Sequence, residues 1–252
     1  MSLLKQNQLS TDENVEKQWR SLYKLGGAAA IVGLMGNLLD IAIGMLLGGD
    51  ISKTITAIDR FAQFQGSALV GLYNFDLLNV CISIIMIPAF LALCAAHRRV
   101  NPAYAALAML IFSIGTAIFI TNNTALPMLT LSDKYAAAAT EGQKNLLAAA
   151  GEAMLARGAH GSPGAFLGFV FSIIANLVMA LVMLKGKIFG KATAYMGILG
   201  TALLFVYTII VTFVPGIEKV VIVLAMPGGL LAMAWIVMYT IRLFQLGRME
   251  NS

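Results

Sequence analysis

The chain has 252 residues, of which 59% are hydrophobic and only 12% are charged, and its mean hydropathy is +0.84. About a quarter of the residues in an ordinary soluble domain are charged, so this composition excludes that class. The formal net charge of +5 does not indicate nucleic-acid binding, because the basic residues are spread among short loops and form no stripe. We therefore expect an all-α, polytopic transmembrane helical bundle that forms a single membrane domain over residues 1–252.

The polar N-terminal segment is predicted to form a helix that lies in the membrane interface. Ser10 and Glu13 have the spacing of a capping box. Val15, Trp19 and Tyr23 then recur on one helical face, and charged residues occupy the rest of the surface. The alternative is a polar leader that docks nowhere in particular.

Six apolar segments are long enough to cross a bilayer. They cover about residues 26–48, 66–96, 104–126, 163–184, 193–214 and 220–246. We expect Pro88 to bend the second span, and the run Pro227-Gly228-Gly229 to interrupt the sixth and to form a possible site wall. The alanine-rich segment over about 132–158 is too charged to span, so it is expected to form one or two helices outside the bilayer.

Small and polar residues form a stripe on two of the spans. On the first span, an arc of about 80° holds Gly33, Asn37, Asp40, Gly44 and Gly48, and the fourth span carries Gly164, Gly168, Ser172 and Asn176 at steps of four. Such stripes let another helix approach closely, either within the chain or in a homo-oligomer or membrane partner. The two stripes also share a faint likeness, Gly36-Asn37-Leu38-Leu39 against Ala175-Asn176-Leu177-Val178, and three spans apart this would form an inverted repeat.

The second span carries the polar group that most needs an explanation. Asp76, Asn79 and Ser83 fall within about 60° of one helical face, and Asn74 points the opposite way. An aspartate near the bilayer centre costs roughly 2.5–3.5 kcal/mol, so it usually faces protein or a water-filled cavity. Asp40 of the first span is expected at a similar depth. Two such carboxylates resist double ionisation, which is the physical basis for a proton, cation or amine site.

The candidate ligand-binding set has eight members drawn from spans one to four and the loops beside them: Asp76, Asp40, Asn79, Asn37, Asn122, Asn123, His160 and Asn176. The alternative is that these Asn and Asp side chains only form hydrogen bonds between helices, each worth about 0.6 kcal/mol.

Catalytic, metal and cofactor sites are not indicated. His97 and His160 are the two histidines, and they are predicted at opposite membrane faces, which argues against a haem or zinc site. The sequence has no HExxH, GxSxG or Walker motif. We therefore expect no cofactor, no metal and, on balance, no enzymatic activity.

The basic residues predict the orientation. The N-terminus, the second and fourth loops and the C-terminus hold 11 of the counted Lys and Arg residues, and the other side holds six. By the positive-inside rule, both termini should be cytoplasmic.

Three stretches near helix ends resemble a known family. They are Leu22-Tyr23-Lys24-Leu25-Gly26-Gly27, the run from Leu184 to Lys191, and Ala194-Tyr195-Met196-Gly197-Ile198-Leu199-Gly200. They are similar to the bacterial six-span membrane proteins grouped as domain of unknown function 4386, over about Leu22 to Arg248. The resemblance implies a multi-pass protein of a prokaryotic cytoplasmic (inner) membrane, and it implies no activity, substrate or site residue.

Two functional hypotheses follow from the sequence. The first is a carrier or sensor that binds a proton, a cation or a small polar or amphipathic ligand in a polar pocket within the bundle. The second is a non-enzymatic structural or interaction subunit of a membrane complex. In both, the lipid bilayer surrounds the chain and no nucleic acid takes part.

Overall fold

The computed structural model describes residues 2–47, 55–159, 162–214 and 216–248, and these residues form helices and connecting turns without a strand. This confirms the predicted all-α bundle. The helices, in chain order, are α1 (Ser2–Leu47), α2 (Ala57–Gly66), α3 (Ala68–Tyr73), α4 (Leu77–Ile85), α5 (Ile87–Ala96), α6 (Pro102–Asn122), α7 (Ala125–Ala137), α8 (Glu141–Gly158), α9 (Pro163–Gly186), α10 (Lys191–Phe213) and α11 (Glu218–Arg248).

Six stretches among these helices are long and apolar enough to cross a membrane. They are Asn14–Leu46, Leu77–Ala96, Pro102–Ala137, Gly164–Gly186, Lys191–Phe213 and Val221–Arg248. A polytopic helical bundle with six spans is therefore confirmed.

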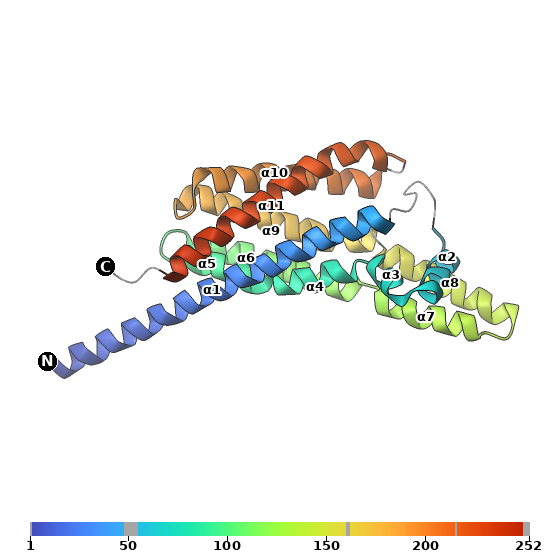
Figure 1. The fold of residues 1–252 in the computed structure, drawn as a ribbon, viewed down its shortest axis with the longest axis horizontal. Coiled ribbons are helices and arrows are strands. Elements are labelled where there is room, and N and C mark those ends of the chain that lie inside the picture. The colour runs from blue at the N-terminus through green and yellow to red at the C-terminus, as the bar shows by residue number, and fades with distance from the viewer. Residues whose placement is uncertain (1, 48–54, 160–161, 215, 249–252) are drawn as a thin grey trace.

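The six spans lie lengthwise along the long axis of the molecule (Figure 1), and their contacts close a ring in chain order. α1 packs on α5 and α11, α6 packs on α5 and α9, and α10 packs on α9 and α11. One hydrophobic core runs through the ring, with Phe90, Leu93, Met179, Met183 and Tyr239 among its buried side chains.

Both small-residue stripes face the protein itself. A methyl group added at Gly33 or Gly36 of α1 would lie within 3 Å of a side chain of α4 or of the turn after it. One added at Gly168 of α9 would lie 2.9 Å from Phe119 Cβ of α6. At Gly168 the neighbouring atoms include the backbone of Phe119, so the two helices approach too closely for a larger residue, whereas at Gly33 and Gly36 the neighbours are the side chains of Met86 and Ile82. Gly48 of the predicted stripe lies outside the described residues.

The apolar run over 66–96 is not one helix with one bend. α3 ends at Tyr73, and Asp76 adopts a left-handed conformation (φ 58°) before α4 begins at Leu77. The run divides again at Met86, between α4 and α5, because Pro88 has no N–H to give to the carbonyl of Ile84, and a bend at Pro88 stays a prediction. The membrane-spanning part of this run is therefore shorter than the sequence predicts.

The expected interruption of the sixth span is wrong. α11 passes through Pro227 without a break. Gly228 serves packing instead, because a methyl group at Gly200 of α10 would lie 2.8 Å from Ala232 N and 3.0 Å from Gly228 O, whereas nothing lies within 4 Å of a methyl group added at Gly229. The close contact between α10 and α11 accompanies a continuous helix where the sequence favours a break.

Four helices form a smaller cluster at one end of the ring. α7 and α8 make a hairpin, α2 and α3 pack against it, and Phe61, Phe64, Phe75 and Met128 are buried between them. Glu152 of α8 accepts a hydrogen bond from the backbone N–H of Ala57 (2.7 Å) at the start of α2. These helices include the segment over 132–158 that the sequence predicts to lie outside the bilayer, and its placement relative to lipid stays a prediction.

α1 is continuous from Ser2 to Leu47, so the predicted N-terminal interfacial helix joins the first span without a break. Its position in the membrane interface stays a prediction.

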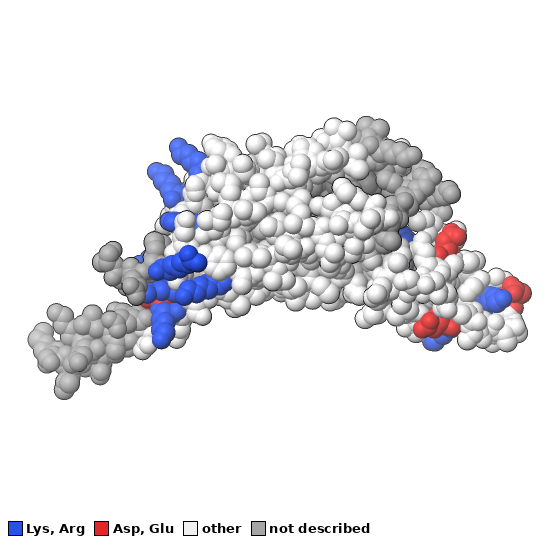
Figure 2. All heavy atoms as spheres, in the orientation of Figure 1, with Lys and Arg blue, Asp and Glu red and all other residues white. Residues whose placement is uncertain are grey.

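The middle of the molecule carries no charged side chains on the face shown in Figure 2. Lys and Arg gather at the end where α1 begins and α11 ends, and both signs of charge occur at the other end, over α7 and α8. The uncharged band between them is the part of the surface suited to lipid.

Candidate functional site

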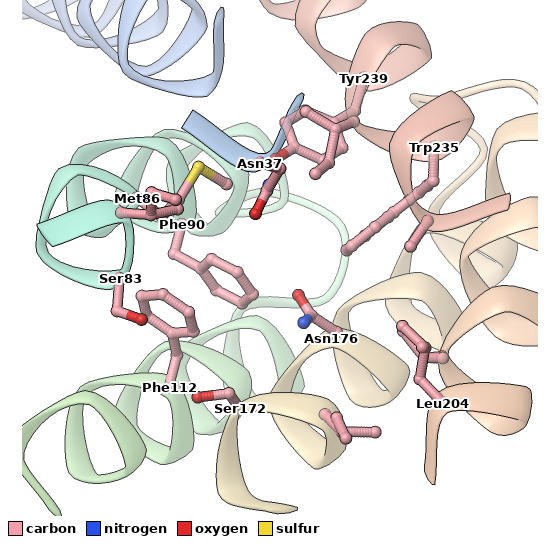
Figure 3. Close-up of a pocket in the computed structure, with 15 residues that line it drawn as sticks. Asn37, Ser83, Met86, Phe90, Phe112, Ser172, Asn176, Leu204, Trp235 and Tyr239 are labelled. Atoms are coloured by element: carbon pink, nitrogen blue, oxygen red, sulfur yellow. The ribbon is translucent and has the colours of Figure 1, made fainter. Parts of the chain in front are cut away.

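A cavity of about 160 Å³ lies inside the ring of six spans (Figure 3). Its described lining residues come from α1, α4, α5, α6, α9, α10, α11 and the turn at residue 86. They are Asn37, Ile82, Ser83, Met86, Phe90, Phe112, Ser172, Ile173, Asn176, Thr201, Leu204, Ala232, Trp235, Ile236 and Tyr239.

Two asparagines of the predicted set, Asn37 and Asn176, enter this cavity from opposite sides (Figure 3). At 1.5 Å per residue, Asn37 lies about 15 Å from the end of α1, and Asn176 lies about 15 Å from the end of α9. α1 and α9 run in opposite directions, so these two ends lie at opposite sides of the bundle. Both amides are therefore close to the middle of a hydrocarbon core about 30 Å thick.

Four polar side chains in the cavity lack a hydrogen-bond partner within the described part of the chain: Asn37, Ser172, Asn176 and Tyr239. The other polar groups are occupied. Ser83 Oγ donates to the carbonyl of Asn79 (2.9 Å), and Thr201 Oγ1 donates to that of Gly197 (2.5 Å). Trp235 Nε1–H is directed to the sulfur of Met183 (3.2 Å). The free hydrogen-bonding capacity of the cavity thus lies in two carboxamides and two hydroxyls.

Aromatic rings form two walls of the cavity. Phe90 of α5 and Phe112 of α6 stack face to face, with ring centroids 3.9 Å apart and an interplanar angle of 5°. On α11, Trp235 and Tyr239 meet edge to face with centroids 5.0 Å apart. The Tyr239 hydroxyl is fully buried and has no partner among the described residues. The rings give the cavity flat, apolar sides.

No described lining residue is ionisable at neutral pH. Asp40 and Asp76, which the sequence places at the centre of the candidate site, are not among the lining residues. The electrostatics of the cavity are therefore those of neutral dipoles.

Asp76 lies at the corner between α3 and α4 and is 7% exposed. Asn79 Nδ2 donates to its Oδ1 (3.2 Å). Arg60 of α2 supplies a positive charge nearby: burial lowers the pKa of this guanidinium, and the charge of Asp76 opposes that shift. Arg60 also lies over the ring of Phe75, 5.5 Å from its centroid. In this setting Asp76 joins the outer helix cluster to the ring.

Asp40 is half-buried beside the same corner. Its backbone carbonyl accepts a hydrogen bond from the hydroxyl of Tyr73 (2.8 Å), three residues before Asp76 in the chain. The two aspartates therefore belong to one region, where the second half of α1 meets α3 and α4.

Asn122 and Asn123 hold the corner between α6 and α7. Asn122 Nδ2 donates to the carbonyl of Gly164 (2.7 Å), and Asn123 Nδ2 donates to that of Phe75 (2.6 Å). His160, the last member of the predicted set, lies outside the described residues. The structure thus divides the set between a corner group and the two cavity asparagines, and a ligand-binding role for any of them stays a prediction.

Sequence reasoning missed the aromatic part of the cavity. Trp235 and Tyr239 are four residues apart, which places them on one face of α11, but that spacing is equally typical of an ordinary packing face. Phe90 and Phe112 carry no pattern that distinguishes them from other core residues. Among the described residues, no group of three His, Cys, Asp or Glu side chains could hold a metal ion.

The closed ring of six apolar helices around a largely apolar cavity with a few polar side chains defines a polytopic helical membrane protein. A family model described as "Domain of unknown function (DUF4386)" matches residues 27–239. The chain belongs to this family, as its resemblance at the helix ends predicts. No curated protein and no solved structure matches the chain.

Proposed function

We propose that this protein is a membrane-embedded binding protein, a carrier or a sensor, whose small ligand occupies the central cavity. The observation that carries the proposal is that Asn37, Ser172 and Asn176 have no hydrogen-bond partner among the described residues and face one cavity in the middle of the bundle.

Unpartnered amides are expensive in such a place. A polar group that is shielded from water and has no hydrogen bond costs roughly 1–3 kcal/mol. Asn37 and Asn176 are partly buried by protein and face the cavity. An asparagine that only packs helices together satisfies its amide across the helix interface, as Asn122 does with Gly164. Asn37 and Asn176 do not, and a ligand or water in the cavity would complete their hydrogen bonds.

The arrangement of the ring supports the carrier form of the proposal. α1, α4–α5 and α6 make one half of three spans, and α9, α10 and α11 make the other. Two halves with three spans each enter the membrane from opposite sides. Many carriers bind their substrate near the midplane between two such inverted halves. Asn37 and Asn176 hold corresponding places in the two halves, which is the position that a shared substrate site requires.

The test is the thermal unfolding of ligand-free protein in lipid nanodiscs, for wild type, Asn37→Leu and Asn176→Leu. Leucine has the same number and branching of side-chain heavy atoms as asparagine, the cavity beside both positions leaves room for its larger methyl groups, and it leaves no unpaired amide. We therefore expect both variants to unfold at or above the temperature of the wild type. Asn122→Leu is the matched control, because it removes an amide that has a partner, and it should unfold at a lower temperature.

The same measurement distinguishes the alternative function. If Asn37→Leu and Asn176→Leu lose as much stability as Asn122→Leu, the two amides serve packing. The proposal would then be abandoned in favour of a structural or interaction subunit.

We propose further that the basic end of the ring faces the cytoplasm of a prokaryotic cell, with the protein in the cytoplasmic membrane. The loops and helix ends there carry Lys24, Arg98, Arg99, Lys185, Lys187, Lys191 and Arg242. Retention of Lys and Arg on the cytoplasmic side is the strongest general determinant of orientation.

A further inference from the structure

We infer that the ligand of the central cavity is a small, uncharged, planar molecule with a hydrogen-bond donor and an acceptor side by side, of the class of aromatic or cyclic carboxamides. The inference rests on the proposed function and names the ligand class for that same site.

The cavity excludes ions by its lack of counter-charges. Its described lining offers amides, hydroxyls and rings but no ionised group. Asp76 lies two helical turns before Ser83, about 10 Å away at 1.5 Å per residue. An ion that entered would lose its hydration without gaining a partner of opposite charge, which is strongly unfavourable. A neutral ligand meets no such barrier.

The free polar groups prescribe both a donor and an acceptor on the ligand. Each asparagine carboxamide presents a carbonyl oxygen next to an NH₂ group. Such a group pairs in a bidentate manner with an edge that has a donor and an acceptor side by side, as asparagine does with adenine. Asn37 and Asn176 offer this pattern from opposite sides, and Ser172 adds a hydroxyl. A ligand with acceptors alone would leave their carbonyl oxygens unpaired.

The walls select a flat ring of limited size. The stacked pair Phe90 and Phe112 lies across the cavity from Trp235, as Figure 3 shows. The volume of about 160 Å³ is close to that of an engineered cavity of about 150 Å³ that holds benzene. One six-membered ring with a single polar substituent therefore matches the space, and a longer molecule does not.

Trp235 makes occupancy of the cavity directly observable. The chain has two tryptophans, and the other, Trp19, lies at the basic end of the ring beside Arg98. In a Trp19→Phe background, the fluorescence of Trp235 alone reports on the cavity. The protein is titrated in nanodiscs with benzamide, benzoate, benzylamine and N,N-dimethylbenzamide, which share one ring and differ in charge or in the amide donor.

We expect benzamide to change the Trp235 emission saturably. Benzoate, protonated benzylamine and N,N-dimethylbenzamide should bind at least tenfold more weakly. Asn176→Leu should weaken benzamide at least tenfold, whereas Ser113→Ala should leave its affinity unchanged, because the Ser113 hydroxyl on α6 bonds to its own helix outside the cavity lining.

Two results would overturn the ligand class. One is binding of benzoate or benzylamine as tight as that of benzamide and sensitive to Asn176→Leu, and this would leave the proposed function intact. The other is the absence of a saturable response to benzamide, or a response that Asn176→Leu does not alter. The stability of the ligand-free Asn→Leu variants then decides independently whether the cavity is a binding site at all.

Discussion

Asn37 of α1 and Asn176 of α9 point into one cavity from opposite sides, and neither amide has a hydrogen-bond partner in the described part of the chain. In the sequence, each follows a small residue and precedes two large aliphatic ones. The likeness of the two segments thus coincides with a shared position in space. Two antiparallel helices that carry the same polar group to the same depth are what an inverted repeat would produce.

Because α10 and α11 approach closely at Gly200, we predict that this position does not tolerate an added methyl group. In Gly200→Ala, the new Cβ would meet backbone atoms of α11, Ala232 N at 2.8 Å and Gly228 O at 3.0 Å. Backbone cannot move aside as a flexible side chain can, so we expect a loss of about 1–3 kcal/mol of stability. Gly229→Ala on the facing helix is the control, because nothing lies within 4 Å of its added methyl group. Thermal unfolding of the two variants should therefore diverge, and equal losses would contradict this account of the contact.

Hydropathy and helical periodicity were sufficient to predict the six spans and the helix faces that pack together. Long apolar runs are required for each helix to satisfy its backbone in lipid, so they are visible in any membrane sequence. Gly33 and Gly168 stand at helical steps from other small residues, and that pattern indicated the buried faces of α1 and α9.

The differences between the structure and the sequence-based predictions come from tertiary contacts, which leave no periodic signal in the sequence. The residues around Asp76 are as apolar as a continuous helix needs, but the chain turns there because α3 packs against α7 in the outer cluster. Pro227 favours a break, but α11 is continuous along its close contact with α10. The aromatic walls could not be predicted, because a ring that lines a cavity and a ring that fills a core have the same sequence pattern.

The junction between α1 and the end of α5 predicts unequal roles for two neighbouring arginines. Glu16 accepts hydrogen bonds from Arg98 (3.0 Å) and from Arg99 (2.8 Å). The Arg98 side chain is 24% exposed, lies over the ring of Trp19 at 4.6 Å and also donates to the hydroxyl of Tyr23. The Arg99 side chain is 78% exposed. Exposed ion pairs contribute about 0–1 kcal/mol, and a partly desolvated cation–π contact adds about 0.5–1 kcal/mol.

We therefore expect Arg98→Gln to lower the stability by about 1–2 kcal/mol and Arg99→Gln by less than about 0.5 kcal/mol. Thermal unfolding in nanodiscs at low and high salt checks this. The effect of Arg99→Gln should vanish in high salt, because exposed pairs are screened, and most of the Arg98→Gln effect should persist. Equal effects of the two variants would show that the ion pair with Glu16 alone holds this junction.

The proposed orientation predicts which loops are accessible from outside the cell. In a background with Cys81→Ser and Cys94→Ala, Lys144→Cys on α8 should react with a membrane-impermeant maleimide in intact cells. Lys187→Cys, which follows α9 at the basic end, should react only after the membrane is permeabilised. Cys81 and Cys94 are both unpaired in the structure, so removing them breaks no disulfide. Labelling of Lys187→Cys in intact cells would reverse the orientation.

We predict that the protein loses stability in mild acid because the imidazole of His97 is buried. This side chain follows α5 at the basic end and is fully buried, with Nδ1 2.9 Å from the carbonyl oxygen of Leu93 and the ring stacked on Phe189. Its Nε2 has no partner among the described residues. Burial lowers the pKa of His97 below the ordinary value of 6.5, because the charged ring loses its hydration.

Because folding lowers the pKa of His97, acid destabilises the folded protein relative to the unfolded chain. The unfolded chain takes up the proton at a pH near 6.5, before the folded protein does. The stability contributed by neutral His97 is thus complete above about pH 6.5 and falls as the pH is lowered, by at most about 1.4 kcal/mol per pH unit. Thermal unfolding of wild type and His97→Gln between pH 8 and pH 5 should show this slope in the wild type and a flatter profile in the variant. His160→Gln is the control, since it removes the other histidine of the chain and should retain the slope of the wild type. A slope that His97→Gln leaves unchanged would assign the acid sensitivity to other titratable groups, such as the carboxylate of Glu16 that pairs with Arg98 and Arg99.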